Sequence, residues 1–441
     1  MERTLISKTP EKVGQQVLLK GWVNTRRDHG KIVFLDLRDR SGLIQVVLTA
    51  DQAGKIHTED VVYIEGLVKA RPPKLVNPKM ETGTVEIEAE KVEVAVTAAE
   101  LPFDMGQPEL ELELPTLLDN RALTLRHPKV RAIFKVQEVI IDSFREALKA
   151  RDFMEFQAPS IISSVPEGGA EVFRIKYYDH EAYLSQSPQL YKSLLVGAFE
   201  RVFSVNQIFR AEPSVTTRHL AVATSLDAEF GFLDSWKDVL ELQEYVVRYI
   251  FTQVAEKCPA ELALFNATLP RLSDSIPVIK LREAQQIIFE RTGRDVRHEK
   301  DLAPEDEREI CLWAQEKHGS ELIFVSHFLT KKKPFYVYPD PQDPGYGFSV
   351  DLLGRGVEWS SGGQRLHDYS EIRKAAEEWG LKESDIELYL QSFRYGVPPL
   401  GGFALGAERM TMHILGLKNI REASLFPRDM ERIDTRFSRK S

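Results

Sequence analysis

The chain has 441 residues but only two cysteines and no long apolar run. Cys258 and Cys311 lie too far apart in the sequence for a C-x-x-C motif, and neither stands among histidines at metal-ligand spacing, so we expect two buried free thiols. No stretch reaches the roughly 18 apolar residues that a membrane span needs, and the first residues lack the pattern of a signal peptide. We therefore expect a cytoplasmic protein without membrane contact.

The sequence also lacks a phosphate-binding P-loop and an excess of positive charge. The pattern G-x-x-x-x-G-K-[ST] is absent, so a nucleotide would have to be held by side chains instead of a loop of backbone amides. The net charge of −9 argues against indiscriminate coating of nucleic acid, although it permits a local basic face. Residues 1–50 offer such a face, because they contain nine lysines and arginines against five acids.

Five short runs rich in β-branched residues occupy the N-terminal part of the chain, up to about Ala89. Turn residues separate them and glycines stand at bend positions, which is typical of a small closed barrel of the OB type. The runs are residues 17–23, 32–37, 43–48, 61–68 and 85–89.

A change of composition marks a domain boundary. Between Glu100 and Asn120, prolines and acids predominate, which predicts a hinge without regular structure. A chain of this length also exceeds what one hydrophobic core usually supports. We therefore expect an OB-fold domain at 1–102, a hinge at 103–125 and a second domain at 126–441.

The second domain is predicted to mix helices and strands. Apolar residues from Ile133 to Leu148 recur at spacings of three and four, which predicts an amphipathic helix over residues 130–149. Strand-like and helix-like segments alternate after it. Strands are expected at residues 184–187, 202–205, 225–232, 323–326 and 348–353, and helices at 239–251, 282–291 and 305–318.

Three residues of the expected barrel suggest contact with single-stranded nucleic acid. Arg27 is followed by Phe34 and Gln45 on the next two strands. On an OB barrel a ring can stack on a base, and an amide can read its edge. The alternative is a solvated loop beside a core phenylalanine.

Polar residues near two of the expected strands could line a ligand pocket. Lys192 ends a run of serines and glutamines and offers a point charge for a carboxylate, although most lysines are simply solvated. Arg210, Glu212, Arg218 and His219 flank a loop between two expected antiparallel strands. They can face one ligand across this hairpin, or form a charged edge with weak surface ion pairs.

Two acids stand among apolar residues, where an unpaired carboxylate is costly. A hard cation such as Mg²⁺ would satisfy Asp351 and Glu358, and ion pairing with Arg355 or Arg365 is the alternative.

The glycine-rich segment 401–406 leads into Arg409. Small residues there would let a planar ring approach the backbone while Arg409 reaches a phosphate. The alternative is an ordinary turn before a helix.

In order and spacing, these segments resemble the three signature motifs of class II aminoacyl-tRNA synthetases: a long helix ending near Pro159, residues 209–232 and residues 401–415. Within that class the chain resembles the aspartyl-tRNA synthetases most closely, over essentially its full length. The resemblance implies an α+β fold, with an N-terminal OB-fold β-barrel followed by a catalytic domain built on an antiparallel β-sheet flanked by helices. The diagnostic runs are residues 186–192, 360–367, 419–422 and 425–429.

The front barrel, at residues 21–28, is similar to the bacterial anticodon-binding domain. Only residues 233–350 separate the second motif from Asp351, so the extra inserted domain of bacterial members is expected to be missing, as in the shorter archaeal or eukaryotic form. Residues 213–215 and Trp359 depart from the usual pattern of the family.

The resemblance implies ATP-dependent activation of L-aspartate and its transfer to the 3′ end of tRNA-Asp, with ATP as a substrate and Mg²⁺ as a cofactor. The implied catalytic residues are Arg210, Glu358 and Arg409. The implied aspartate-binding residues are Glu171, Gln189, Lys192, Arg210, Ser361 and Arg365. The implied ATP-binding residues are Arg210, Glu212, Arg218, His219, Leu220, Glu358, Gly406 and Arg409. Mg²⁺ would be bound by Asp351, Glu358 and Ser361, and the anticodon by Arg27, Phe34 and Gln45.

The family also implies a homodimer built on the first motif, and the apolar helix face from Ile133 to Leu148 is compatible with such an interface. Two alternatives stay open, an asparaginyl-tRNA synthetase and a non-catalytic RNA-binding paralogue. Lys192 and Arg365 favour the aspartyl enzyme, because cations suit a carboxylate better than an amide. The sequence leaves open whether tRNA-Asn is a second substrate.

Overall fold

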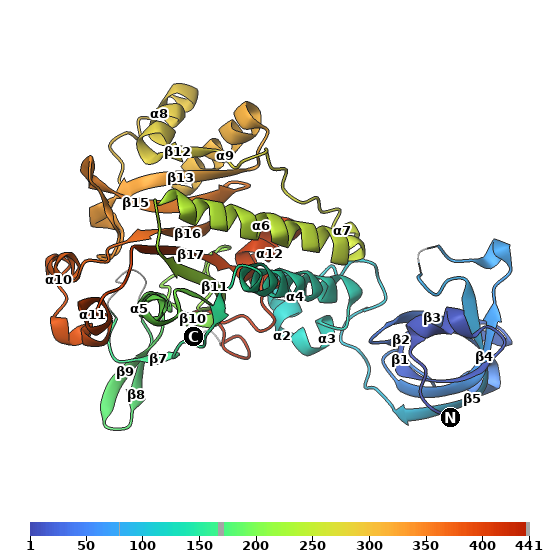
Figure 1. Ribbon diagram of the computed structural model, residues 1–441. Helices are drawn as coiled ribbons and strands as arrows, with labels where there is room; N and C mark the ends of the chain where they lie inside the picture. The colour runs from blue at the N-terminus through green and yellow to red at the C-terminus, as the bar shows by residue number, and fades with distance from the viewer. Residues whose placement is uncertain (79, 166–171, 438–441) are drawn as a thin grey trace. The chain divides into compact units, whose positions relative to one another are not determined.

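The computed structural model describes residues 1–78, 80–165 and 172–437, and the chain divides into two compact units, Met1–Glu111 and Leu112–Ser441 (Figure 1). The division falls inside the segment predicted to be a hinge. The prediction that this segment has no regular structure is wrong, since two short helices, α2 (Leu114–Asp119) and α3 (Arg121–Thr124), lie within it. Pro115 does not oppose α2, because proline is tolerated in the first turn of a helix.

The first unit is a closed barrel with strand order β1-β2-β3-β5-β4, which confirms the OB fold. Apolar side chains alternate toward a fully buried interior, as the period of a strand requires. The strands are β1 (Gln16–His29), β2 (Ile32–Asp39), β3 (Gly42–Thr49), β4 (Val61–Ala70) and β5 (Val85–Val96), and the short helix α1 (Ala50–Ala53) follows β3.

The second unit is built on one large sheet with the order β12-β13-β15-β16-β17-β11-β10-β6. Its centre, from β13 to β10, is antiparallel as expected, whereas β12 and β6 pair in parallel at the two edges. The strands are β6 (Met154–Glu155), β10 (Arg201–Phe209), β11 (Val222–Gly231), β12 (Val278–Lys280), β13 (Leu322–Leu329), β15 (Asp343–Gly354), β16 (Val357–Arg365) and β17 (Leu400–Gly406), with β14 (Pro339–Asp340) beside β15.

One face of this sheet is covered by α4 (Pro128–Lys149), α6 (Lys237–Lys257) and α12 (Ala407–Leu415), and α4 and α6 lie side by side in Figure 1. The apolar face of α4 from Ile133 to Leu148 packs into this core and is almost completely buried within the same chain. The expectation that this face could serve a dimer interface is therefore wrong, since the protein's own sheet and helices already cover it.

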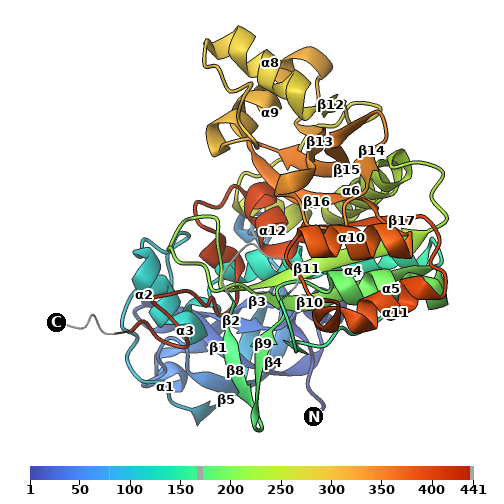
Figure 2. The ribbon, with the colours of Figure 1, turned by 90° about the vertical axis from the view of Figure 1, so that its left-hand side faces the viewer.

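The opposite face carries α5 (Gln189–Phe199), which shares a core with α10 (Tyr369–Glu378) and α11 (Glu387–Arg394). Near the β12 edge, α8 (Leu281–Thr292) and α9 (Pro304–His318) pack on β13, as Figure 2 shows. The remaining α-helix is α7 (Pro259–Leu264), and the remaining strands form a small sheet of β7 (Ile161–Ile162), β9 (His180–Leu184) and β8 (Arg174–Tyr177).

Both cysteines are buried free thiols, as expected. Within the described ranges, no helix is both long and apolar enough to cross a membrane.

Candidate active site

The alternation of side chains along β11 places acids on the face of the sheet that α5 covers. Leu226 and Ala228 point into the core beneath α4 and α6, so Asp227 and Glu229 point the other way. The neighbouring strand β17 pairs Gly402 with Glu229, and a Cβ at this glycine would lie 2.3 Å from Glu229 Oε2. Glycine is therefore required where the strand passes the buried carboxylate.

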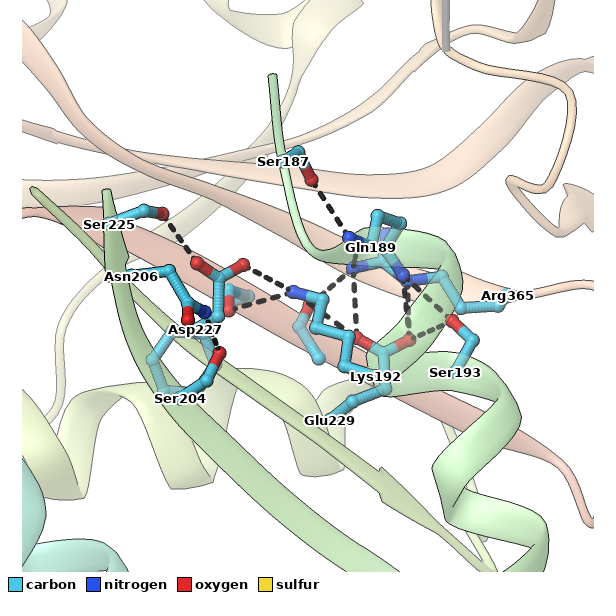
Figure 3. Close-up of polar contacts among 12 residues, drawn as sticks. Ser187, Gln189, Lys192, Ser193, Ser204, Asn206, Ser225, Asp227, Glu229 and Arg365 are labelled. Carbon is cyan, nitrogen blue, oxygen red and sulfur yellow. Dashed lines mark hydrogen bonds and ion pairs between the residues drawn. The ribbon is translucent and has the colours of Figure 1, made fainter. Parts of the chain in front are cut away.

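Helix α5 and strand β16 supply cations to these acids (Figure 3). Lys192 Nζ donates to Asp227 Oδ1 at 2.9 Å and lies 3.5 Å from Glu229 Oε2. Arg365 Nε donates to Glu229 Oε1 at 3.0 Å. The amide of Gln189 bridges the network, because its Nε2 donates to Glu229 while its Oε1 accepts from Arg365.

The charges of this network are almost completely shielded from water. Burial alone would raise the pKa of Glu229, but Arg365 and Lys192 outweigh it and hold this pKa below its usual value. The carboxylate is therefore ionised at neutral pH. A buried ion network satisfied in this way orients its members, although it contributes little net stability.

The network borders a cavity of about 370 Å³. Three of the six residues predicted to bind aspartate, Gln189, Lys192 and Arg365, belong to this network, and two more, Arg210 and Ser361, line the cavity. The sixth, Glu171, lies outside the described residues. The residues predicted to bind aspartate that line the cavity are Gln189, Lys192, Arg210, Ser361 and Arg365.

A second cavity of about 320 Å³ contains the residues predicted to bind ATP. Arg210 and Ser361 line both cavities, so the two cavities adjoin. The predicted residues that line the second cavity are Arg210, Glu212, Arg218, His219, Leu220, Glu358, Gly406 and Arg409.

His219 belongs to the cationic side of this second cavity. Partial burial lowers its pKa, and Arg409, Arg210 and Arg218 lower it further. The imidazole is therefore neutral at pH 7, and the positive charge on this side comes from the arginines.

The two acids predicted to bind Mg²⁺ share one face of the sheet. Asp351 on β15 pairs with Ser361 on β16, and a β-bulge between Leu352 and Leu353 shifts the register so that Glu358 points to the same side. Without the bulge, positions 358 and 361 would face opposite sides. Burial and the neighbouring Asp351 raise the pKa of Glu358, which shows that the two carboxylates act on each other.

The oxygens of Asp351 differ in their surroundings. Oδ2 accepts from Lys333 Nζ at 2.8 Å, whereas Oδ1 is buried without a hydrogen-bond partner among the described residues. An unpaired buried oxygen beside a second carboxylate fits a hard divalent cation that takes further ligands from a substrate. In the same described part of the chain, no group of three or more acidic, histidine or cysteine side chains is arranged to hold a metal alone.

The barrel brings the three predicted nucleic-acid residues together on neighbouring strands. Arg27 pairs with Phe34 and Asp36 with Gln45 in the register of the sheet. Arg27 donates to both oxygens of Asp36 at 2.9 Å, which orients its guanidinium on this face. His29 packs edge-on against the half-buried Phe34 ring at 5.5 Å.

Sequence reasoning missed Asp227, Glu229 and Lys333. The two acids carry a readable signal, since residues 225, 227 and 229 place polar groups on one side of a strand, while Leu226, Ala228 and Phe230 place apolar groups on the other. Lys333 carries no such signal. Its position depends on the path of the loop after β13, and the preceding Lys331 and Lys332 look identical in sequence.

Comparisons with known proteins agree with this architecture. The family model of class II tRNA synthetases (D, K and N) matches residues 113–430, and that of the OB-fold nucleic acid binding domain matches residues 17–95. The chain is 40% identical to the aspartate–tRNA(Asp/Asn) ligase of Deinococcus radiodurans, covering 98% of this chain and 99% of the relative. It is 38% identical to the aspartate–tRNA(Asp) ligase of Pyrococcus abyssi, covering 96% and 97%.

A solved structure of similar shape is the asparaginyl-tRNA synthetase of Pyrococcus horikoshii complexed with asparaginyl-adenylate, with a TM-score of 0.89, 34% identity and coverage of 98% of this chain and 99% of that one. The match of the family model over most of the chain and the full-length relatives lead to the same conclusion: the chain belongs to the class II tRNA synthetases of the D, K and N group and carries their OB-fold domain.

Proposed function

We propose that this chain is an aspartate–tRNA ligase, which activates L-aspartate with ATP and transfers it to the 3′ end of tRNA-Asp. The observation that carries the proposal is the buried network of Lys192, Arg365, Asp227 and Glu229, which borders one cavity while arginines line the next. Full-length relatives named aspartate–tRNA ligases support it.

The charge of the first cavity favours aspartate over asparagine. Three cations, Lys192, Arg210 and Arg365, stand against two carboxylates, Asp227 and Glu229, which leaves one positive charge. The adjacent Lys333–Asp351 pair is neutral, and Lys332 is exposed to solvent. Free aspartate brings one net negative charge and completes the balance. Asparagine brings none and leaves a cation unpaired, which costs roughly 3 kcal/mol in a site closed to water.

Activation joins the aspartate α-carboxylate to the α-phosphorus of ATP and releases pyrophosphate. This reaction needs no nucleophile from the protein, so positioning and charge neutralisation carry the catalysis. Arg210 lines both cavities and therefore contacts the carboxylate and the α-phosphate together. Arg218, His219 and Arg409 hold the β- and γ-phosphates. The adenine is held by Glu212, Leu220 and the backbone at Gly406.

Asp351, Glu358 and Ser361 hold Mg²⁺ in this proposal. The support is the unpaired Oδ1 of Asp351 and the register shift that aims Glu358 at the same face. When held by these residues, Mg²⁺ would supply charge neutralisation for the phosphates of ATP.

The barrel supplies the contact with tRNA. Phe34 stacks on the middle anticodon base, Gln45 reads its edge, and Arg27 contacts the backbone or a neighbouring base. Two hydrogen bonds to Asp36 fix the orientation of the Arg27 guanidinium, which supports a prearranged binding face. Relatives of both kinds are known, those named for tRNA(Asp) and those named for tRNA(Asp/Asn), so tRNA-Asn is a candidate second substrate.

The chain acts as a homodimer in this proposal, through surfaces other than the buried face of α4. The short strand β6 lies at an open edge of the sheet, where Met154 is exposed. Apolar side chains are also exposed along the C-terminal segment, at Leu425, Phe426, Met430 and Ile433. An open strand edge and exposed apolar groups are each suitable surfaces for a second copy.

The test is aminoacylation of purified tRNA-Asp and tRNA-Asn, assayed separately with aspartate and with asparagine. Charging of tRNA-Asp with aspartate is expected, and added asparagine should not compete. The similar structure from Pyrococcus horikoshii is an asparaginyl-tRNA synthetase, so an asparaginyl enzyme is the alternative. Such an enzyme would charge tRNA-Asn with asparagine instead. Absence of any charging together with retained tRNA binding would indicate a non-catalytic paralogue.

A further inference from the structure

Lys333 is a mostly buried cation beside the acids proposed to bind Mg²⁺, and the reaction described above gives it no role. It follows the short 3-10 turn Thr330–Lys332 in the loop after β13. Its Nζ donates to Asp351 Oδ2 at 2.8 Å, and the ammonium lies 4.0 Å from the centre of the Phe328 ring. Only 17% of the Lys333 side chain is exposed, so its ion pair with Asp351 is largely shielded from water, unlike a surface salt bridge.

The ammonium takes up coordination capacity that a metal would need. Of the two oxygens of Asp351, only Oδ1 is left without a partner in the described part of the chain. The second acid, Glu358, also has a cation beside it. Arg409 Nη1 lies 3.6 Å from Glu358 Oε1 and donates a hydrogen bond to the Glu358 backbone carbonyl at 2.7 Å. Two carboxylates therefore face two resident cations, and the four groups sum to zero charge.

This balance changes when a nucleotide binds. A divalent ion that approaches alone meets the repulsion of two cations and finds few free oxygens. A triphosphate draws Arg409 to its own oxygens and supplies further ligands, so an ion that arrives with the nucleotide meets a more favourable site.

We propose that Lys333 is a resident counter-cation that closes the Asp351–Glu358 site to divalent cations in the free enzyme and makes their binding depend on nucleotide. This inference rests on the proposed metal site. Lys333 acts through Asp351 and is a positioning residue. The neighbouring Lys331, exposed on the same loop, lacks this role and provides a matched control.

The test measures Mn²⁺ binding to the full-length protein by electron paramagnetic resonance, without nucleotide. The wild type should bind Mn²⁺ weakly. Lys333→Gln keeps a hydrogen-bond donor but removes the charge, so it should bind Mn²⁺ at least about tenfold more tightly. Lys333→Arg and Lys331→Gln should behave as the wild type, and the double variant Lys333→Gln/Asp351→Asn should lose the gain, which assigns the bound ion to this site.

The same Mn²⁺ titration with a non-hydrolysable ATP analogue tests the counter-cation role of Lys333 and the proposed metal site separately. Nucleotide-dependent Mn²⁺ binding that Glu358→Gln weakens supports the metal site. If that holds but the wild type binds Mn²⁺ without nucleotide as tightly as Lys333→Gln, the counter-cation role is refuted and the site survives. If Glu358→Gln and Asp351→Asn leave binding unchanged with the nucleotide, the metal site itself is wrong. Should Lys333→Gln fail to fold, tight nucleotide-free binding by the wild type alone would still overturn the inference.

Discussion

At the scale of one residue, Arg365 joins a proposed role in substrate choice to a role in stability. Its guanidinium is buried and donates to Glu229, to Gln189 and to the carbonyl of Gly402. Arg365→Leu removes the cation for the substrate and leaves Glu229 with Lys192 as its remaining charge partner. We expect the rate of aspartate-dependent pyrophosphate exchange, as kcat/KM, to fall about 1,000-fold or more. The free energy of unfolding should also fall by about 3–5 kcal/mol, since one member of a buried ion network is lost.

Urea unfolding at pH 7 and pyrophosphate exchange measure the two effects separately. Arg373→Leu on α10 is the matched control, because that arginine is more than half exposed and should change neither quantity measurably. Near-normal exchange by Arg365→Leu with aspartate would contradict the assignment of the pocket.

His413 predicts a pH effect that is independent of catalysis. Burial, with Arg409, Arg218 and Arg355 nearby, lowers the pKa of His413 to about 4. The unfolded chain therefore binds this proton near pH 6.5, whereas the folded protein resists it until about pH 4. Stability is lost as the pH falls through this window, by about 3 kcal/mol in total. Unfolding of His413→Gln should show a correspondingly smaller loss between pH 6.5 and 4. His298→Gln, at an exposed position, should keep the wild-type slope.

The residues found from sequence share one property: each is typical of its motif regardless of fold. Lys192, Arg210, Arg365 and Arg409 were predicted on that basis and meet around two adjoining cavities. Asp227 was not predicted as a site residue, because an acid inside a strand is recognised only after the opposite, apolar face of the strand is assigned. Lys333 could not be predicted from the sequence, because the consecutive lysines 331–333 differ only in the direction in which the loop points their side chains.

At the scale of elements, strand β17 has a small-residue face that the site requires. Gly402 faces Glu229, and a Cβ there would lie 2.0 Å from the Ala228 carbonyl oxygen. Gly402→Ala must displace the backbone or the buried carboxylate. We expect a loss of unfolding free energy of about 1–3 kcal/mol and a higher KM for aspartate. Gly406→Ala on the same face meets only an ordinary 3.5 Å contact with Arg409 Cβ and should unfold like the wild type. Equal stability of the two variants would refute the close-approach argument.

Periodicity predicted the long elements, because it depends only on the chain's own pattern. Helices α4, α6 and α9 and the strands of the barrel lie where their apolar repeats place them. The same rule could not reveal the bulge that turns Glu358 toward Ser361, since one extra residue in a strand is visible only against its partner. Periodicity also led to the wrong expectation that the apolar face of α4 could serve a dimer interface. A periodic pattern shows that a helix face is buried but not which part of the protein buries it.

At the scale of the whole molecule, the proposed chemistry and the proposed tRNA recognition belong to separate units of the chain. The family model of the synthetase covers residues 113–430, and that of the OB-fold domain covers residues 17–95. The cavities of the proposed reaction lie entirely in the second unit, Leu112–Ser441, and the face of Arg27, Phe34 and Gln45 lies entirely in the first. A change in the barrel should therefore act on tRNA binding alone.

Phe34→Ala tests this separation. The ring is half-buried on the outer face of β2, and its loss removes a stacking platform worth about 1–3 kcal/mol per base. Aminoacylation should therefore show a KM for tRNA raised by roughly 5- to 150-fold, the same energy expressed as a ratio. Pyrophosphate exchange without tRNA should keep its wild-type rate, since the cavities proposed for that reaction are lined by residues of the second unit. Leu35→Ala removes a fully buried neighbour and serves as the contrast, because it should lower the stability of the barrel. Equal losses in both steps with Phe34→Ala would show that adenylate formation depends on the barrel and would contradict the division of labour.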